Sequence, residues 1–140
     1  MRQPLPPTPA PKSPLRVFLV EDSAAVRELM IENLSDIPGL SFTGFADTES
    51  DALAQLQQDA HDVVIFDIEL KQGNGISLLR TLATAGLLEH TFKIIFSNNV
   101  SSAYRRVGEQ YGVRYFFDKT SELPRLRHLL EQVTQGISVR

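Results

Sequence analysis

Five polar residues in this chain end or directly follow a run of hydrophobic residues. Glu21 and Asp22 follow VFLV, Asp67 follows VVIF, Ser97 ends FKIIFS, and Lys119 follows YFFD. Three carboxylates, a hydroxyl and an ammonium group can bind a cation and an anion side by side. Each residue taken alone has a simpler interpretation, because acids and serines at such positions often cap the next helix. Together, at the ends of four hydrophobic runs, they favour a shared site.

The charges of these residues predict a divalent metal ion. Carboxylates that lie close together repel one another, so their ionised state needs positive charge nearby. Lys119 supplies one positive charge, and a divalent cation would supply two more. Oxygen ligands without histidine or cysteine indicate magnesium, or manganese in its place, rather than zinc. Because magnesium keeps several waters and binds phosphate oxygens, we expect an open site that accepts an anionic group.

Strand-like and helix-like segments alternate along the chain after the first residues. The hydrophobic runs are rich in β-branched and aromatic residues, and the segments between them carry apolar residues at helical spacing. Pro38-Gly39 and Gly73-Asn74-Gly75 are turn signals, and residues 48–51 resemble a capping box. The predicted strands are residues 15–21, 40–46, 62–67, 92–97 and 113–118, and the predicted helices are residues 23–35, 52–58, a helix after residue 75, 101–112 and 121–133.

This order of elements predicts the fold class. Continuous hydrophobic strands that alternate with helices imply a parallel sheet covered on both faces. Right-handed crossovers then leave few topologies, so we expect an α/β protein with a doubly wound five-stranded parallel sheet. In such a sheet the carboxyl ends of the strands share one edge. The five polar residues should therefore converge there.

Size and composition limit the classes of function. A chain of 140 residues suits one domain, predicted over residues 15–136, and its formal charge of −3 offers no basic surface for nucleic acid. Without cysteine, neither a disulfide nor a thiolate metal site is possible. No apolar stretch is long enough for a membrane span or a signal peptide, which predicts a cytoplasmic protein without membrane contact.

The first residues form a separate segment. Residues 1–14 contain six of the eight prolines and few apolar side chains. This composition predicts a disordered, proline-rich tail. The tail could be a recognition arm, or a solubilising leader or the remnant of a linker.

The ordered set of residues resembles the receiver domain of two-component response regulators. The similarity covers roughly residues 15–136, and it implies a flavodoxin-like (β/α)5 fold with strand order 2-1-3-4-5. No single motif is specific, but the whole set in this order is. The matching parts are Glu21-Asp22 after the first strand, Asp67 after the third, the turn Gly73-Asn74-Gly75-Ile76, Ser97 after the fourth strand and Lys119 after the fifth.

The resemblance implies a role for each of these residues. Asp67 would be the phosphoacceptor, which takes a phosphoryl group from a phosphohistidine on a sensor histidine kinase or a histidine phosphotransfer protein. Ser97 and Lys119 would contact the phosphoryl oxygens, and neutralising charge there is the main help a protein gives to phosphoryl transfer. The magnesium ion (Mg²⁺) would be held by Glu21, Asp22, Asp67 and the backbone carbonyl of Glu69.

A conformational switch is also implied. A phosphoryl group adds about −1.5 to −2 charge and three acceptor oxygens, which would pull Ser97 inward. The vacated space would let Phe116 turn inward and reshape the face made by the fourth helix, fifth strand and fifth helix. Core packing is the alternative role for Phe116. Four arginines could give this face a basic rim, or could be solvated helix positions: Arg105, Arg106, Arg125 and Arg127.

Four further positions bear on the reaction. Glu69 and Asn99 lie two residues after Asp67 and Ser97, where they should flank the path of an attacking water and tune hydrolysis. Two positions depart from the family pattern. Thr120 replaces the usual proline after the lysine, so the usual cis peptide bond is in doubt. Asn98 stands where the family favours a small residue, which narrows access to the site.

The residues support a stand-alone receiver that signals through an unidentified protein target, or relays the phosphoryl group onward. It would not be an enzyme beyond accelerating its own phosphorylation and dephosphorylation. One alternative is a pseudo-receiver scaffold that works without phosphorylation. Another is a receiver fragment of a larger transcriptional regulator. A flavin-binding protein is disfavoured, because no phosphate-cradling loop follows the first strand.

Overall fold

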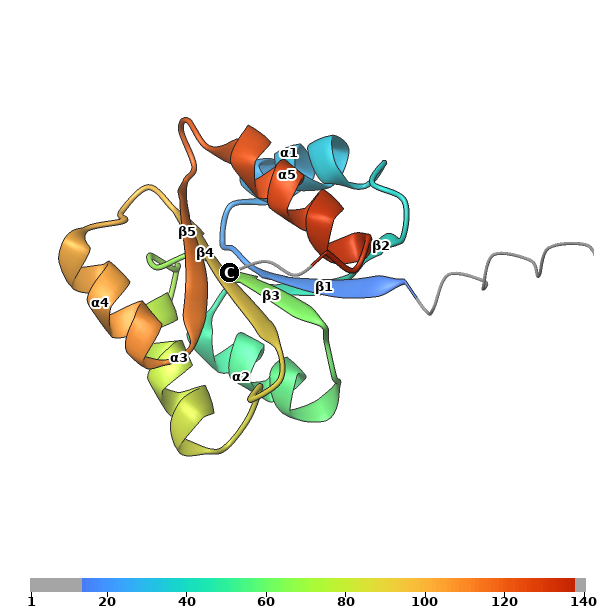
Figure 1. Ribbon diagram of the computed structural model, residues 1–140. Coiled ribbons are helices and arrows are strands. Elements are labelled where there is room, and N and C mark those ends of the chain that lie inside the picture. The colour runs from blue at the N-terminus through green and yellow to red at the C-terminus, as the bar shows by residue number, and fades with distance from the viewer. Residues whose placement is uncertain (1–13, 138–140) are drawn as a thin grey trace, which may run out of the picture.

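The five predicted strands form one parallel sheet in the order β2-β1-β3-β4-β5, which confirms the predicted fold class and strand order (Figure 1). The computed structural model describes residues 14–137. All four residues of β3 are buried, as expected for a strand covered on both faces. The strands are β1 (Leu15–Val20), β2 (Leu40–Ala46), β3 (Val63–Phe66), β4 (Phe92–Ser97) and β5 (Val113–Asp118).

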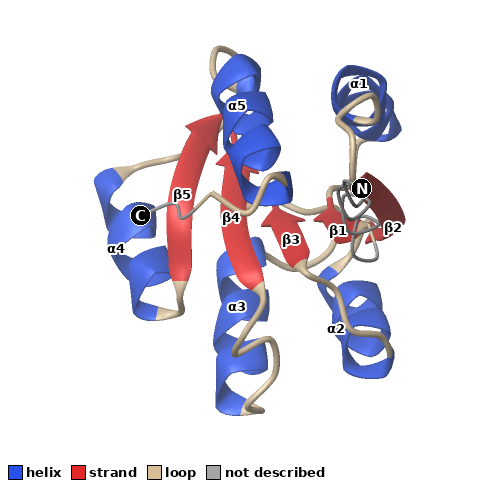
Figure 2. Cartoon of the chain, turned by 45° about the vertical axis from the view of Figure 1, so that its right-hand side comes forward, coloured by secondary structure: helices blue, strands red, loops and turns tan. Residues whose placement is uncertain are grey.

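Helices cover both faces of the sheet. In Figure 2, α1 and α5 lie on one side of the strands, and α2, α3 and α4 lie on the other. This split explains the uninterrupted hydrophobic runs, because successive residues of a strand point to opposite faces and both faces are buried. The helices are α1 (Ala24–Leu34), α2 (Glu49–Gln58), α3 (Gly75–Thr84), α4 (Ser102–Gln110) and α5 (Leu123–Thr134).

The hydrophobic core therefore has two halves. Each fully buried aliphatic or aromatic side chain contributes about 1.5–3 kcal/mol relative to an exposed one. On the side of α1 and α5 the strands bury Val17, Leu19, Val63, Ile65, Ile94 and Phe96, and on the side of α2, α3 and α4 they bury Phe18, Val20, Val64, Phe66 and Ile95.

Strand register fixes which loops meet at the carboxyl edge. Val20 at the end of β1 pairs with Phe66 at the end of β3. The chain continues this alignment beyond the strands, since the N–H of Asp67 donates to the carbonyl of Val20 at 2.8 Å. On the other side of β1, the N–H of Glu21 donates to the carbonyl of Ala46 at 3.0 Å. Glu21 and Asp67 therefore leave the sheet side by side.

Side-chain caps set the starts of four helices. Ser23, Thr48, Asn74 and Ser101 each accept a hydrogen bond from a backbone N–H in the first turn of α1, α2, α3 and α4. The Thr48 oxygen accepts from Asp51, as the capping-box pattern predicts. The predicted element ends differ from the observed ones by a few residues, since caps and turns, not hydrophobic period, decide them.

Three other expectations concern membrane spans, the tail and one peptide bond. None of the helices within residues 14–137 is both long enough and apolar enough to cross a lipid bilayer. The predicted tail lies outside the described residues, apart from Pro14. The peptide bond between Lys119 and Thr120 is trans, consistent with the missing proline.

Candidate functional site

Asp67 lies at the centre of a hydrogen-bonded group at the carboxyl edge of the sheet. The hydroxyl of Ser97 donates to one carboxylate oxygen, Oδ1, at 2.7 Å, and the ammonium of Lys119 donates to the other, Oδ2, at 2.6 Å. Asp67 is 5% exposed and Ser97 is 1% exposed. The structure thus brings together residues that are 30 and 52 positions apart in the chain.

Backbone contacts hold these side chains in place. The N–H of Lys119 donates to the carbonyl of Ser97 at 3.2 Å, which continues the β4–β5 pairing past the end of the strands. The Ser97 oxygen also accepts from the N–H of Asn99 at 3.3 Å. Because a carboxylate oxygen accepts hydrogen bonds, the proton of this hydroxyl is directed to Asp67.

Three carboxylates, including that of Asp67, lie close together at this site. Glu21, Asp22 and Asp67 each offer an oxygen, and these oxygens lie within 4.8 Å of one another. Lys119 forms salt bridges with both Glu21 and Asp67, so one ammonium serves two buried carboxylates. This set of oxygens fits a hard divalent cation such as magnesium, which would supply the positive charge that one lysine cannot.

The protonation of Glu21 and Lys119 reflects this crowding. Burial raises the pKa of the Glu21 carboxyl, and hydrogen bonds from Lys119 and Ser23 oppose that effect without cancelling it. Burial alone would lower the pKa of Lys119, but hydrogen bonds to Asp67 and Glu21 outweigh it, so the pKa is raised. Lys119 therefore stays charged.

Arg27 supports Glu21 from the second turn of α1, a contact that no pattern in the sequence predicted. Its guanidinium donates to the backbone carbonyl of Glu21 at 2.7 Å and stacks over the ring of Phe45 at 4.0 Å. The N–H of Ser23 donates to the carboxylate of Glu21 at 3.0 Å. Both contacts depend on how the loop after β1 turns, which hydrophobic spacing does not encode.

A cavity of about 330 Å³ opens beside Asp67. Polar side chains dominate its lining, as an anionic ligand with a metal would require. Glu69 and Asn99 meet near the site through a hydrogen bond of 3.1 Å, so the two predicted hydrolysis-tuning residues contact each other. The lining residues are Glu21, Asp22, Ser23, Val26, Asp67, Glu69, Ser97, Asn98 and Lys119.

Gly75 allows the loop after β3 to pass close to the site. A Cβ atom on this residue would lie 2.1 Å from the backbone oxygen of Asp67. The N–H of Gly75 donates to the carbonyl of Ile68 at 2.7 Å. The close approach of two backbones explains why the turn predicted from Gly73-Asn74-Gly75 contains a glycine here.

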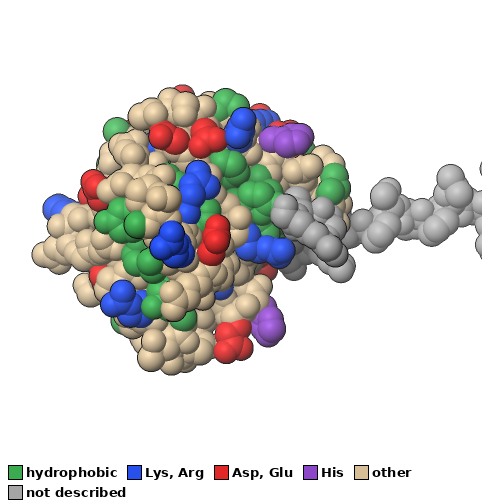
Figure 3. Space-filling model, turned by 60° about the vertical axis from the view of Figure 1, so that its left-hand side comes forward, with side chains coloured by type: hydrophobic (Ala, Val, Ile, Leu, Met, Phe, Trp, Pro, Cys, Tyr) green, Lys and Arg blue, Asp and Glu red, His purple; other side chains and the backbone are tan. Residues whose placement is uncertain are grey.

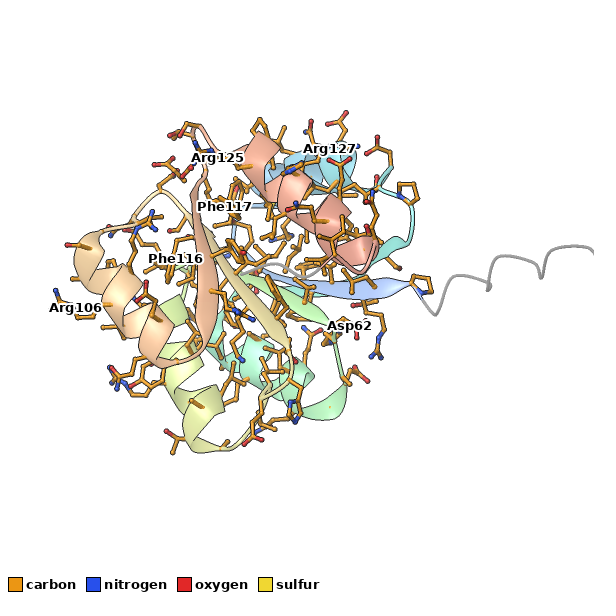
Figure 4. All side chains as sticks on the ribbon, in the orientation of Figure 1. Asp62, Arg106, Phe116, Phe117, Arg125 and Arg127 are labelled. Atoms are coloured by element: carbon orange, nitrogen blue, oxygen red, sulfur yellow. The ribbon has the colours of Figure 1, made fainter. Side chains whose placement is uncertain are left out.

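Phe116, the residue predicted to act as a switch, is turned inward in this structure. Its side chain is 7% exposed and packs between β5 and α4 (Figure 4). The predicted movement of Phe116 on phosphorylation stays a prediction. The ring lies against Gly108, with the guanidinium of Arg105 at 5.3 Å from its centre. Absence of a side chain at Gly108 makes this inward position possible.

Three of the four arginines suggested for a basic rim on the face of α4, β5 and α5 are exposed, which fits both a rim and solvated helix positions. Figure 3 shows cationic and hydrophobic side chains interspersed on one face of the molecule. Arg105, Arg106 and Arg125 are exposed. Arg127 instead binds Asp36 at 2.6 Å, beyond the end of α1, so it ties α5 to α1 and leaves the rim (Figure 4).

The fold and this arrangement define a receiver domain of two-component signalling. The family model of the response regulator receiver domain matches residues 17–131, so the chain belongs to this family. The match includes every residue that we predicted for the site.

Curated relatives include enzymes and a transcription factor. Over 90 residues the chain is 31% identical to "protein-glutamate methylesterase/protein-glutamine glutaminase 5" of Anaeromyxobacter dehalogenans, covering 64% of this chain and 24% of that protein. Over 68 residues it is 37% identical to the "DNA-binding transcriptional activator DevR/DosR" of Mycobacterium tuberculosis, covering 49% of this chain and 31% of that protein. The chain thus spans less than a third of either relative.

Solved structures share the fold. The response regulator domain of Thermotoga maritima CheB superimposes with a TM-score of 0.74 at 24% identity, covering 91% of this chain and 98% of that one. A LuxR-family two-component response regulator from Aurantimonas sp. SI85-9A1 gives a TM-score of 0.78 at 23% identity, covering 91% and 90%. At these identities the likeness establishes the architecture alone.

Proposed function

We propose that the chain is a phospho-accepting receiver in which Asp67 takes a phosphoryl group from a phosphohistidine. The donor would be a sensor histidine kinase or a histidine phosphotransfer protein. One observation carries the proposal: the two oxygens of the Asp67 carboxylate are bound separately, one by Ser97 and one by Lys119. A helix-capping aspartate would not need a buried hydroxyl and an ammonium on its two sides.

The transfer would exchange one bond for another. A carboxylate oxygen of Asp67 forms a bond to phosphorus while the bond from phosphorus to the donor's imidazole nitrogen breaks. The imidazole leaves with the electron pair and takes up a proton. Ser97 and Lys119 already point their donors at Asp67, so they can shift these hydrogen bonds to phosphoryl oxygens as charge builds there.

Glu21, Asp22, Asp67 and the backbone carbonyl of Glu69 would hold magnesium. The fit rests on the three carboxylate oxygens within 4.8 Å and on the absence of histidine or cysteine among them. When bound, magnesium would neutralise negative charge on the transferring oxygens. Lys119, which follows β5, adds a positive charge to the site. Glu69 and Asn99 would control access of water to the phosphorylated Asp67.

Output would pass through the face of α4, β5 and α5. Ser97 links the phosphorylation site to the loop before α4, and Phe116 packs under that helix from β5. A downstream protein would recognise the exposed surface of these elements, and Asp67 chemistry would change its shape. The chain would accelerate only its own phosphorylation and dephosphorylation. Receivers within longer regulators, such as the relatives above, would pass the same change to a domain of their own chain.

An unphosphorylated scaffold is the second candidate, and the inward Phe116 favours it. If the face is already formed without a phosphoryl group, a partner could bind constitutively. The two candidates differ in chemistry at Asp67. Incubation with phosphoramidate and Mg²⁺, followed by ³¹P nuclear magnetic resonance, tests them directly. A protein-bound acyl phosphate signal that hydroxylamine removes supports the receiver, and its absence in folded, magnesium-saturated protein supports the scaffold.

A further inference from the structure

The loop between β3 and α3 is held by one residue from a different helix. Glu49, the first residue of α2, accepts from the N–H of Asn74 at 2.9 Å through Oε1. Its other oxygen, Oε2, accepts from the hydroxyl of Ser77 at 2.9 Å. Its backbone N–H donates to the carbonyl of Gln72 at 3.0 Å. Three contacts from one residue thus fix both sides of the turn into α3.

This turn leads directly to the proposed magnesium site. Glu69 and Asn74 form an isolated antiparallel bridge, so the loop folds back on itself. Asn74 is the residue whose N–H the Glu49 carboxylate binds. The backbone of Glu69 therefore follows β3 directly and pairs with Asn74, which Glu49 holds in place. A second bridge pairs Thr48 with Gln72, which strengthens the same contact.

Gly73 shows how closely the two segments fit. Its φ is +86°, and a Cβ atom there would lie 2.4 Å from the Cβ of Glu49 and 2.6 Å from its Oε1. Only glycine adopts this backbone conformation readily and leaves room for the glutamate. Gly73 and Glu49 are thus matched in space although 24 positions separate them in the sequence.

We infer that Glu49 is a positioning residue for the phosphorylation site: through Asn74 it places the backbone carbonyl of Glu69, the proposed magnesium ligand. The inference rests on the proposed function and adds to it a residue from α2, a helix that makes no hydrogen bond to the Asp67 side chain within residues 14–137. Partners that orient metal ligands are often worth tenfold or more in metal affinity, which gives the scale of the expected effect.

Asp51 provides a matched control. It is also an acid in the first turn of α2, so it shares the favourable interaction of Glu49 with the helix dipole. Among the described residues its carboxylate accepts a hydrogen bond from Gln55 of the same helix alone, at 3.0 Å, and Asp51 is exposed. Asp51→Ala therefore removes the same charge from the same turn without releasing the loop.

The test measures magnesium affinity of the unphosphorylated protein by calorimetry, together with hydrogen exchange of the Asn74 amide and unfolding in urea. We expect Glu49→Ala to weaken magnesium binding by about tenfold and to speed exchange at Asn74. Glu49→Gln keeps one acceptor oxygen, so its magnesium affinity should lie between that of Glu49→Ala and that of the wild type. Asp51→Ala should change magnesium affinity by less than about twofold, because exposed charges are screened.

Two results would overturn the inference, and they are distinguishable. If Glu49→Ala frees the Asn74 amide but leaves magnesium affinity unchanged, the loop is held by Glu49 but the metal site does not depend on it. If the folded wild type binds no magnesium, the proposed function fails and the inference fails with it. Should Glu49→Ala not fold, Glu49→Gln takes its place, and an unchanged magnesium affinity in that variant would equally count against the inference.

Discussion

At the scale of single residues, the surroundings of Asp67 separate a reactive carboxylate from a structural one. Aspartates at strand ends usually cap helices, and here Ser23 and Asn74 perform that role for the helices on either side. The two carboxylate oxygens of Asp67 instead accept hydrogen bonds from Ser97 and Lys119. Burying charged groups is costly unless they are well paired, so a group of this kind is retained where its charges serve a function.

Glu69→Ala and Asn99→Ala should both shorten the lifetime of the phosphorylated protein. Their hydrogen bond of 3.1 Å joins the loops after β3 and β4 beside the site. Loss of one such bond is worth about 1 kcal/mol, which corresponds to about fivefold in rate if it limits access of water. Release of inorganic phosphate from phosphorylated protein measures this. An unchanged hydrolysis rate in Glu69→Ala would refute the tuning role.

His61 shows a second buried polar group, at the opposite end of the sheet. It is 8% exposed, its Nδ1 lies 2.8 Å from the hydroxyl of Thr43, and its Nε2 has no partner within the described residues. The Thr43 hydroxyl donates to the carbonyl of Val17 at 3.2 Å, so Nδ1 of His61 donates to that hydroxyl. Burial lowers the pKa of His61, and Arg16 adds to the effect.

The fold should therefore lose stability as the pH falls below about 6.5, the pKa of histidine in an unfolded chain. Below that pH the unfolded state takes up a proton that the folded state resists, which lowers the free energy of unfolding. Urea unfolding at several pH values tests this. His61→Gln should reduce the slope, whereas His128→Gln, at an exposed position, should not. Equal slopes in all three proteins would contradict the prediction.

At the scale of elements, hydrophobic pattern predicts the strands well and the loops poorly. Three strands have the predicted bounds, because buried runs such as FKIIFS have clear ends. Helix α3 was predicted only from a turn and a few apolar positions. The start of α3 depends on Glu49 of α2, which accepts hydrogen bonds from Asn74 and Ser77. These contacts join residues that are far apart in the chain, so they leave no local pattern in the sequence.

Gly75→Ala should damage the loop that leads from Asp67 into α3. The new Cβ would meet the backbone oxygen of Asp67 at 2.1 Å, and backbone cannot move away cheaply. We expect the free energy of unfolding to fall by about 3 kcal/mol or more, measured in urea. Gly39→Ala is the comparison, since its Cβ would have an ordinary contact at 3.9 Å and cost only positive-φ strain, about 1–2 kcal/mol. Equal losses in both variants would contradict the steric explanation.

Gly108→Ala tests the inward position of Phe116. A Cβ at Gly108 would lie 2.8 Å and 2.9 Å from two atoms of the Phe116 ring. We expect a loss of about 1–2 kcal/mol in unfolding free energy, although alanine favours a helix by about 1 kcal/mol over glycine. In a Phe116→Ala background the same change should stabilise, because the clash with the ring is gone and the remaining contact, at 3.2 Å, is with the terminal methyl of Ile95, which can shift. A double-mutant cycle without this reversal of sign would refute the packing.

At the scale of the whole molecule, the parallel sheet converts five separate positions into one site. Alternation of strands and helices predicted the sheet, its edge and the convergence of Asp67, Ser97 and Lys119. The sequence left open whether Phe116 packs in the core, and it could not predict that Arg127 binds Asp36, just beyond the end of α1. Both depend on side-chain packing between elements distant in the chain, which periodicity does not report.

The most direct measurement is the intact mass of the protein after incubation with Mg²⁺ and acetyl phosphate, beside Asp67→Asn. Asparagine keeps the size of the side chain but lacks the nucleophilic carboxylate. We expect one added phosphoryl group in the wild type, none in Asp67→Asn, and none in the wild type after chelation of magnesium. No added mass in folded wild-type protein with magnesium bound, or equal addition to Asp67→Asn, would contradict Asp67 as the phosphoacceptor.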